Sequence, residues 1–366
     1  MTGRHSMKRC TFVILGISLL LSGTFLSRTS PGEAADQTEY DKPGPYQVRS
    51  LEFPDLTDAK RKDRKVPLKV HFPATGGKFP LVVFSHGGGG NWDSYIHQVR
   101  HLASHGYVVV CVEHTDSNNE RIKYYMSRRG GHLRFADALN RTTHDPQAML
   151  QRPGDVSFAI DQAVLWNTGH KALAGMINTG RIGVMGHSYG AYTTLAVCGA
   201  RPIVDYLEPV TSPGRGLGRD YSDPRVTFGL AMSPQPPGTT YFSTESYKTI
   251  NRPIVGMTGS KDTGKTFDDK AMPAEARWQF WDLLPPGNKY FLWLENADHF
   301  SFADNPKAWL FPSESRTDVQ RISKAMMALF CDHFLKGKKE AGGRMNREYV
   351  NSLSGTVVTE IQWREK

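Results

Sequence analysis

Ser188 stands at the centre of a Gly-x-Ser-x-Gly pattern formed by residues 186–190 (GHSYG). The apolar segment 182–185 (IGVM) precedes the pattern, and the largely apolar segment 191–198 (AYTTLAVC) follows it. This order predicts a buried strand, a sharp turn with the serine at its apex, and a helix packed on a sheet. A serine on such a turn projects its Oγ above the sheet, where it can act as a nucleophile. The alternative is a glycine-rich turn in which the serine is incidental.

A serine nucleophile needs a neighbouring base, and that base needs an acid that orients it. In chains that carry this turn, the order is serine, acid and then histidine. We predict Asp262 as the acid and His299 as the base, because each directly follows a predicted apolar strand at the carboxyl edge of the sheet. The alternatives are a turn aspartate and a structural histidine. Asp268 and Asp269 are rivals for the acid.

The oxyanion that forms when a serine attacks a carbonyl needs preorganised N–H donors. One predicted donor is the backbone of Tyr189, which directly follows the serine. The second is Gly88, in the glycine-rich loop 86–90 (HGGGG) that follows the apolar segment 81–85 (LVVFS). A flexible turn is the alternative. The loop is not a phosphate-binding P-loop, because no Gly-Lys-Ser/Thr follows it.

Aromatic residues and histidines near these motifs could serve the site, but each could also have a purely structural role. Trp92 and Phe300 flank the motifs and are candidates to line an aromatic substrate pocket, although core packing explains each equally well. His97, His101 and His105 recur at four-residue spacing on one predicted helix face. They lack the His-Glu pattern and cysteine neighbours of a zinc site, so we expect solvent or core contacts, no metal and no cofactor.

Composition and charge indicate a globular protein and argue against nucleic acids as partners. The chain has 366 residues, of which 39% are hydrophobic, and its net charge is +9. The basic residues are scattered, with clusters at 60–65 and 336–339 that we expect to be solvated. Because no recognition motif accompanies them, we predict no nucleic-acid binding. Buried free thiols are favoured for Cys111, Cys198 and Cys331, although one pair could bridge in an oxidising compartment.

The first residues have the pattern of an export signal. Lys8 and Arg9 precede the apolar run 11–21, and residues 32–34 (GEA) offer a small-x-small cleavage site. The run is too short for a comfortable membrane span. We therefore predict a signal peptide at residues 1–35, a secreted or periplasmic protein, and no stable span after cleavage. An uncleaved N-terminal anchor is the alternative.

Hydrophobic patterning predicts a single α/β domain over residues 36–366. Alternation at 46–53 and 66–72 predicts an antiparallel hairpin at the sheet edge. Further strands are predicted at 81–85, 107–112, 182–185, 226–231, 254–259, 289–294 and 355–361, and helices at 92–105, around 133–139, and at 153–166, 191–198, 274–284 and 316–335. Asp155 is expected to be the N-cap or a first-turn acid of the helix that begins at Pro153. Two long connections, 113–153 and 201–223, separate these elements, and the first is predicted to cover the site as a cap or pocket wall.

These motifs, in this order, resemble the α/β-hydrolase superfamily over roughly residues 66–335. The matching segments are 85–88 (SHGG), 186–190 (GHSYG), 259–262 (GSKD) and 298–300 (DHF). Segments 102–107 (LASHGY), 112–114 (VEH) and 152–155 (RPGD) are most similar to the dienelactone-hydrolase-like and platelet-activating-factor-acetylhydrolase-like branch, near cutinase-like polyester hydrolases. The resemblance implies a mostly parallel central sheet with an antiparallel N-terminal hairpin and helices on both faces.

The resemblance also implies an activity, with two departures. Dienelactone hydrolases use a cysteine where this chain has Ser188, and the acetylhydrolases take their acid from a position that here holds residues 232–234 (MSP). The acid is therefore expected one strand later, at Asp262. The expected function is that of a serine hydrolase, which cleaves carboxylic esters of small molecules, lipids or polymers through a Ser-His-Asp triad and an acyl-enzyme. An acyltransferase with the same triad and a non-catalytic binding protein with this fold are the alternatives.

Overall fold

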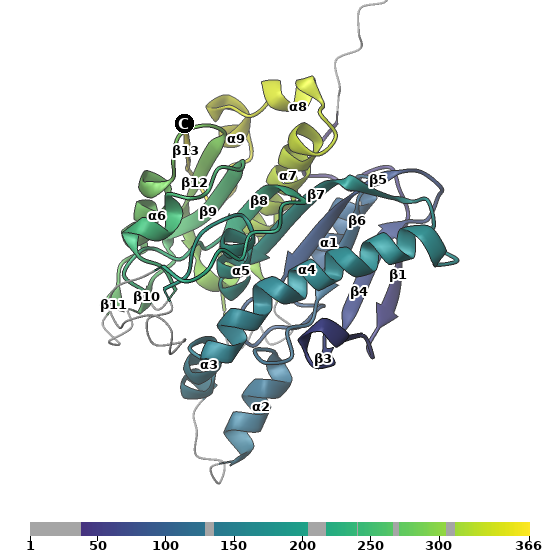
Figure 1. Cartoon of the computed structure of the whole chain (residues 1–366). Coiled ribbons are helices and arrows are strands. Elements are labelled where there is room, and N and C mark those ends of the chain that lie inside the picture. Colours follow the sequence, from purple (N-terminus) through teal and green to yellow (C-terminus); the bar gives the residue numbers. More distant parts are fainter. Residues whose placement is uncertain (1–37, 129–134, 204–216, 240, 266–270, 305–311) are drawn as a thin grey trace, which may run out of the picture. The chain divides into compact units, whose positions relative to one another are not determined.

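Figure 1 shows the computed structural model of the chain. It describes residues 38–128, 135–203, 217–239, 241–265, 271–304 and 312–366. The predicted signal at 1–35 and the rival acids Asp268 and Asp269 lie outside the described residues. Contacts within Thr38–Lys366 make one compact unit.

A central sheet carries the site, and within the described ranges it has nine strands in the order β1-β4-β6-β5-β7-β8-β9-β12-β13. Their bounds are β1 Val48–Phe53, β4 Leu68–Pro73, β5 Phe79–Ser85, β6 Val108–Val112, β7 Ile177–His187, β8 Val226–Met232, β9 Ile254–Lys261, β12 Lys289–Asp298 and β13 Ile361–Glu365. The six strands from β6 to β12 in this order run parallel, while β1, β4 and β13 pair antiparallel to their neighbours. The predicted parallel sheet with an antiparallel N-terminal hairpin is therefore confirmed.

Helices cover both faces of this sheet. Their bounds are α1 Ile96–Ser104, α2 Asn119–Arg128, α3 Phe135–Thr143, α4 Pro146–Gly169, α5 Tyr189–Val197, α6 Trp278–Leu283, α7 Arg316–Phe334, α8 Lys339–Gly343 and α9 Arg347–Ser352. Short elements are β2 Thr57–Asp58, β3 Arg64–Lys65, β10 Gly264–Lys265, β11 Ala271–Met272 and the 3₁₀ turns η1 Ala59–Arg61, η2 Thr244–Tyr247, η3 Ala274–Arg277 and η4 His299–Phe302. No helix among the described residues is long and apolar enough to cross a membrane.

The alternation of side chains along β5 divides the core between the two faces. Leu81 and Val83 belong to one buried cluster, together with residues of α4, α5 and α6. Val82 and Phe84 belong to the other, together with residues of α1 and α7. Because both faces are covered, the strand is apolar throughout, as a buried parallel strand requires. Figure 1 shows α4 crossing the front of the sheet.

The predicted start of α4 was wrong by seven residues. The helix begins at Pro146, where the side chain of Asp145 accepts a 2.9 Å hydrogen bond from the backbone N–H two residues later. Pro153 therefore lies inside the helix and cannot donate to the carbonyl of Met149. The hydroxyl of Tyr192 donates to that carbonyl instead, at 3.1 Å. Pro153 in the sequence predicts the start of a helix. It is tolerated inside α4 because Tyr192 of α5 supplies a hydrogen-bond donor to the carbonyl of Met149.

Other predicted boundaries also shifted. The last strand was predicted at 355–361 but begins at Ile361. The carboxylate of Asp318 accepts hydrogen bonds from the N–H groups of Val357 and Val358, so this segment is held as a turn. The predicted connection 113–153 contains α2, α3 and the first turns of α4. Helix α1 starts four residues later than predicted.

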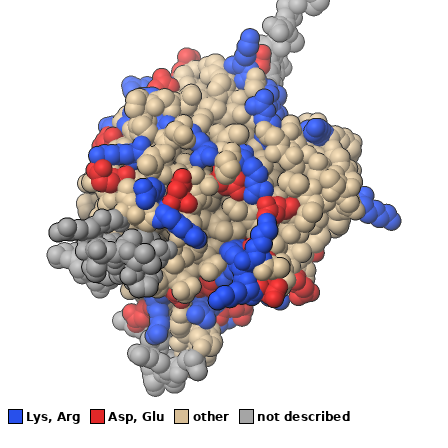
Figure 2. Space-filling view, viewed as in Figure 1, with Lys and Arg blue, Asp and Glu red and all other residues tan. Residues whose placement is uncertain are grey.

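Charges of both signs are mixed on the face shown in Figure 2, where acidic side chains lie beside basic ones. The basic cluster at 60–65 is not simply solvated as predicted. Arg61 and Arg64 are largely buried, and each forms an ion pair with Asp155 at 2.8 Å. These two arginines are therefore part of the interior.

Candidate active site

Ser188 occupies the turn between β7 and α5. Its backbone has φ 56° and ψ −117°, a conformation that non-glycine residues rarely adopt. A Cβ on Gly186 would collide with the backbone of Gly190, and a Cβ on Gly190 would collide with the backbone of Ser85. The strand and helix therefore cross at a distance that only glycine permits at these two positions.

His299 lies between Ser188 and Asp262. Its Nε2 is 2.9 Å from the Oγ of Ser188, and its Nδ1 is 2.8 Å from Oδ1 of Asp262. The three residues follow the carboxyl ends of the parallel strands β7, β9 and β12, which brings them to one edge of the sheet. With the histidine proton on Nδ1, donated to Asp262, Nε2 is free to accept the serine proton.

Asp262 is completely buried and is held by several donors. Arg277 forms an ion pair with it at 3.0 Å, Thr258 donates a 2.7 Å hydrogen bond, and the hydroxyl of Ser233 donates another. Burial works to raise the pKa of this carboxyl, but the charges of Arg277 and His299 hold it well below its usual range. The acid therefore stays ionised at neutral pH. Sequence reasoning missed Arg277, which no motif marks.

His187, the residue before the serine, lies behind the candidate base. Its ring centroid is 4.8 Å from that of His299, and its other side stacks on Phe302 at 5.4 Å. The hydroxyl of Tyr95 is 2.6 Å from its Nδ1. Burial, followed by the charge of His299, lowers the pKa of His187 well below its usual value, so this ring stays neutral. The neutral ring of His187 therefore packs against the ring of His299.

The two predicted oxyanion donors lie on segments that are themselves fixed. Tyr189 is the first residue of α5. In the loop after β5, the N–H of Gly89 donates to Ser117 at 2.8 Å and the N–H of Gly90 donates to Gly87 at 3.1 Å. Within the described part of the chain, no protein acceptor is found for the N–H groups of Tyr189 and Gly88. Their part in catalysis stays a prediction.

The two aromatic candidates differ in their surroundings. Phe300 is 38% exposed and packs edge-on against His299, with ring centroids 5.6 Å apart. Trp92 packs partly on the core, and the ammonium group of Lys69 is 5.9 Å from its ring centroid. Phe300 is therefore adjacent to the candidate base, and a substrate-binding role for either residue stays a prediction.

Two of the three evenly spaced histidines, His101 within α1 and His105 at its C-terminal end, contact the N-terminal segment of the described chain, while His97 is exposed. Nε2 of His101 lies 2.9 Å from the carbonyl oxygen of Tyr40, and Nε2 of His105 lies 2.9 Å from that of Lys42. Among the described residues, no group of three His, Cys, Asp or Glu side chains could hold a metal. The three described cysteines, Cys111, Cys198 and Cys331, are buried free thiols.

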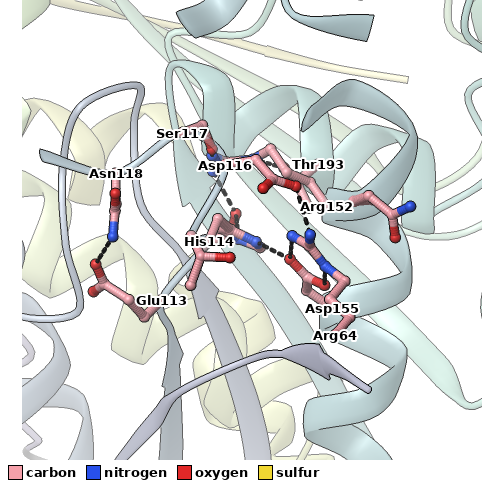
Figure 3. Close-up of polar contacts among 12 residues, drawn as sticks. Arg64, Glu113, His114, Asp116, Ser117, Asn118, Arg152, Asp155 and Thr193 are labelled. Carbon is pink, nitrogen blue, oxygen red and sulfur yellow. Dashed lines mark hydrogen bonds and ion pairs between the residues drawn. The ribbon is translucent and has the colours of Figure 1, made fainter. Parts of the chain in front are cut away.

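A buried polar network that sequence reasoning missed lies beside the glycine-rich loop (Figure 3). Asp155 is neither the helix cap nor the first-turn acid that was predicted, because it lies inside α4 and is completely buried. It accepts hydrogen bonds from Arg64 at 2.8 Å and from Nδ1 of His114 at 2.9 Å. Arg152, one turn earlier on the same helix, is also completely buried. In the sequence, the segment 152–155 (RPGD) indicated a helix start and contributed to the resemblance, but it predicted no buried network there.

Comparison with known proteins gives partial matches. Residues 60–134 match the family model described as platelet-activating factor acetylhydrolase, isoform II. A platelet-activating factor acetylhydrolase of Cavia porcellus is 28% identical over 153 residues, which cover 36% of this chain and 34% of that protein. A bis(hydroxyethyl) terephthalate hydrolase of Streptomyces coelicolor is 28% identical over 191 residues, which cover 52% of this chain and 47% of that protein.

The matches thus span between a third and a half of the length of these relatives. Both are ester hydrolases by name, and the sheet described above has the topology that the resemblance implied. Fold and similarity together support the resemblance of this chain to α/β hydrolases, in particular to platelet-activating factor acetylhydrolases and to a terephthalate ester hydrolase.

Proposed function

We propose that this chain hydrolyses carboxylic esters through a serine acyl-enzyme. The observation that carries the proposal is the unbroken relay from Ser188 through His299 to Asp262, with contacts of 2.9 and 2.8 Å. These distances are within the reach that nucleophile, base and orienting acid need for proton transfer.

In the proposed mechanism, Oγ of Ser188 attacks the ester carbonyl while Nε2 of His299 takes the serine proton. Asp262 holds the ring in the required tautomer and stabilises the imidazolium. The N–H groups of Gly88 and Tyr189 donate to the oxyanion of the tetrahedral intermediate. His299 then gives its proton to the leaving alcohol. A water molecule, deprotonated by the same histidine, attacks the acyl-enzyme; the acid leaves, and His299 returns the proton to Oγ of Ser188. No cofactor takes part.

Similarity to the two relatives supports the substrate class. One relative is named for removing an acetyl group and the other for cleaving a terephthalate ester. We therefore propose esters with a short or compact acyl group as substrates, on a small molecule, a lipid or a polymer. Export, inferred from residues 1–35, would bring the enzyme to such substrates outside the cytoplasm. N-terminal sequencing of the protein from culture medium or periplasm tests this location.

The activity is tested by hydrolysis of p-nitrophenyl esters from acetate to palmitate by the wild type and by Ser188→Ala. We expect turnover that declines beyond short acyl chains and is lost in the variant. Activity extending to palmitate would instead indicate a lipase-like acyl site. If the folded wild type neither cleaves any ester nor reacts at Ser188 with a serine-directed phosphonate, the proposal is wrong and a binding protein is favoured.

A further inference from the structure

Arg152 is a completely buried cation in the middle of the molecule. Its Nε donates to Thr193 Oγ1 at 2.9 Å, one terminal nitrogen donates to Ser117 Oγ at 2.6 Å, and the other donates to Ser85 Oγ at 3.1 Å and to the carbonyl of His86. In the described structure none of these partners is a carboxylate. Buried arginines are usually paired with an acid, so this arrangement calls for an explanation.

The partners of Arg152 belong to the two segments that carry the proposed oxyanion donors. The carbonyl of His86 lies two residues before Gly88, at the start of the glycine-rich loop. On the other side, Thr193 accepts from Arg152 and donates its own proton to the carbonyl of Tyr189 at 3.0 Å. The guanidinium carbon is also 4.3 Å from the ring centroid of Tyr189. One planar group therefore links the loop after β5 to the start of α5.

A second set of contacts fixes Arg152 itself. Ser85 Oγ is 2.9 Å from Nε2 of His114, whose Nδ1 is 2.9 Å from Asp155. Burial, followed by the charge of Arg152, lowers the pKa of His114 to about 3, so its ring is neutral. With its proton on Nδ1, the ring of His114 accepts a hydrogen bond from the hydroxyl of Ser85. The Ser85 oxygen then has a lone pair left to accept the hydrogen bond from Arg152.

Ser85, His114 and Asp155 make contacts like those of a catalytic triad, but solvent and substrate cannot reach them. Ser85, His114 and Asp155 are each 0% exposed, so no ester can reach the serine. Burial opposes ionisation of Asp155, but its hydrogen bonds with Arg64 and His114 hold its pKa well below the usual range. The set is therefore a fixed chain of donors and acceptors that ends on the guanidinium.

Burial also lowers the pKa of Arg152 to about 10, which leaves it charged at neutral pH. A buried charge in a medium of low dielectric acts over a longer range than a solvated one. Behind two N–H donors, a fixed positive charge favours the negative charge that develops on the carbonyl oxygen in the transition state. The ground-state ester carries no such charge and gains much less.

We propose that Arg152 is a positioning residue for the oxyanion hole, which holds the Gly88 loop and the Tyr189 turn in register and supplies positive charge behind them. The inference rests on the proposed ester hydrolysis. Because Arg152 acts mainly on the transition state, its loss should lower kcat much more than it raises KM.

The test compares Arg152→Met with Arg225→Met on p-nitrophenyl acetate. Arg225 is a matched control because it also anchors α4, through the carbonyl of Ser157 at 3.2 Å and an ion pair with Asp161 at 2.6 Å. We expect Arg152→Met to lose kcat by roughly 10²-fold, within the range measured for loss of an oxyanion donor. Affinity for an alkyl boronic acid, whose adduct on Ser188 mimics the tetrahedral intermediate, should fall in parallel. Arg225→Met should lower the denaturation midpoint and leave kcat unchanged.

A milder pair of variants decides the question if Arg152→Met does not fold. Thr193→Val keeps the shape of the side chain and the charge of Arg152, but it removes the acceptor that ties the guanidinium to α5. It should lower kcat with little change in KM, and Thr193→Ser should recover most of that loss.

The outcomes separate this inference from the function on which it rests. If the wild type has no esterase activity, the proposed function falls and this inference with it. If the wild type is active but kcat survives in both Arg152→Met and Thr193→Val, only the inference is overturned. An equal loss of kcat in Arg225→Met, or an equal loss in Thr193→Ser and Thr193→Val, would also overturn it, because either result indicates general destabilisation.

Discussion

The hydroxyl of Ser233, at the end of β8, donates a hydrogen bond to Oδ2 of Asp262, at the end of β9. The resemblance to acetylhydrolases implied an acid at the place that residues 232–234 occupy. Here that place supplies a hydroxyl that supports an acid on the next strand. Besides His299, the donors around Asp262 thus come from three places along the chain: Ser233, Thr258 and Arg277.

The first prediction concerns this acid. Asp262→Asn should lower kcat by up to about 10⁴-fold with the fold retained, because an amide would favour the wrong tautomer of His299. Steady-state kinetics with p-nitrophenyl acetate, with circular dichroism to check the fold, measure this. Asp268→Asn and Asp269→Asn are the matched controls, and each should keep its activity. Full activity in Asp262→Asn together with a loss in either control would refute the assignment.

The sequence predicted most of the strands and the order of the site residues, because these depend on local patterns. Continuous apolar runs mark strands buried on both faces, and glycines mark the turn at Ser188. The start of α4 was missed because Pro153 is tolerated only through Tyr192, which is distant in the sequence. Arg152 and Arg277 were missed for the same reason, since an arginine in a sequence gives no sign of whether it is buried or what it contacts.

The second prediction concerns the turn. Gly190→Ala should prevent the normal fold or greatly lower the denaturation midpoint, because the added methyl group meets the backbone carbonyls of Ser85 and His86. Backbone atoms in a central strand cannot move aside as a flexible side chain can. Gly180→Ala is the matched control within β7, where the nearest atom to the added Cβ would be 3.6 Å away. Similar midpoints for the two variants, measured in urea, would contradict this account of the turn.

The third prediction concerns the carbonyl of Met149, to which Pro153 offers no backbone N–H. Tyr192→Phe removes the hydroxyl that donates to this carbonyl and should lower the free energy of unfolding by about 0.5–1.5 kcal/mol, the net contribution of one hydrogen bond. In a Pro153→Ala background the cost should be smaller, because the new backbone N–H can reach the same carbonyl. A double-mutant cycle in urea measures the difference. Equal costs in the two backgrounds would mean that the hydroxyl does not replace the missing donor.

The fourth prediction concerns stability in mild acid. Burial lowers the pKa of His71 and of His101 from 6.5 to about 4 in each case, and that of His114 to about 3. Between these values and pH 6.5, the unfolded chain binds protons that the folded chain does not bind. Since stability rises with pH wherever the unfolded state binds more protons, the free energy of unfolding should fall as the pH is lowered from about 6.5 to about 4. Each such histidine contributes about 1.4 kcal/mol per pH unit at most.

Carboxyl groups do not explain this window. The pKa values of Asp155 and Asp262 are lowered, so their contributions are lost only below the ordinary value of 3.8. Burial raises the pKa values of Glu113 and Asp304, which acts in the opposite direction, but these are two carboxyl groups against a larger number of buried histidines whose pKa is lowered. Urea midpoints at pH 7, 6, 5 and 4.5 therefore report mainly on the histidines.

A pair of variants identifies the histidines as the cause. His71→Gln keeps a hydrogen-bonding side chain opposite Ser50 but cannot take up a proton, so it should flatten the dependence of stability on pH. Ser50→Ala, which removes the hydrogen-bond partner of His71 but keeps the ring, should leave that dependence in place. If His71→Gln has the same slope as the wild type between pH 6.5 and 4.5, then His71 is not neutral in the folded protein. The loss of stability in acid would then have to arise from groups other than this buried ring.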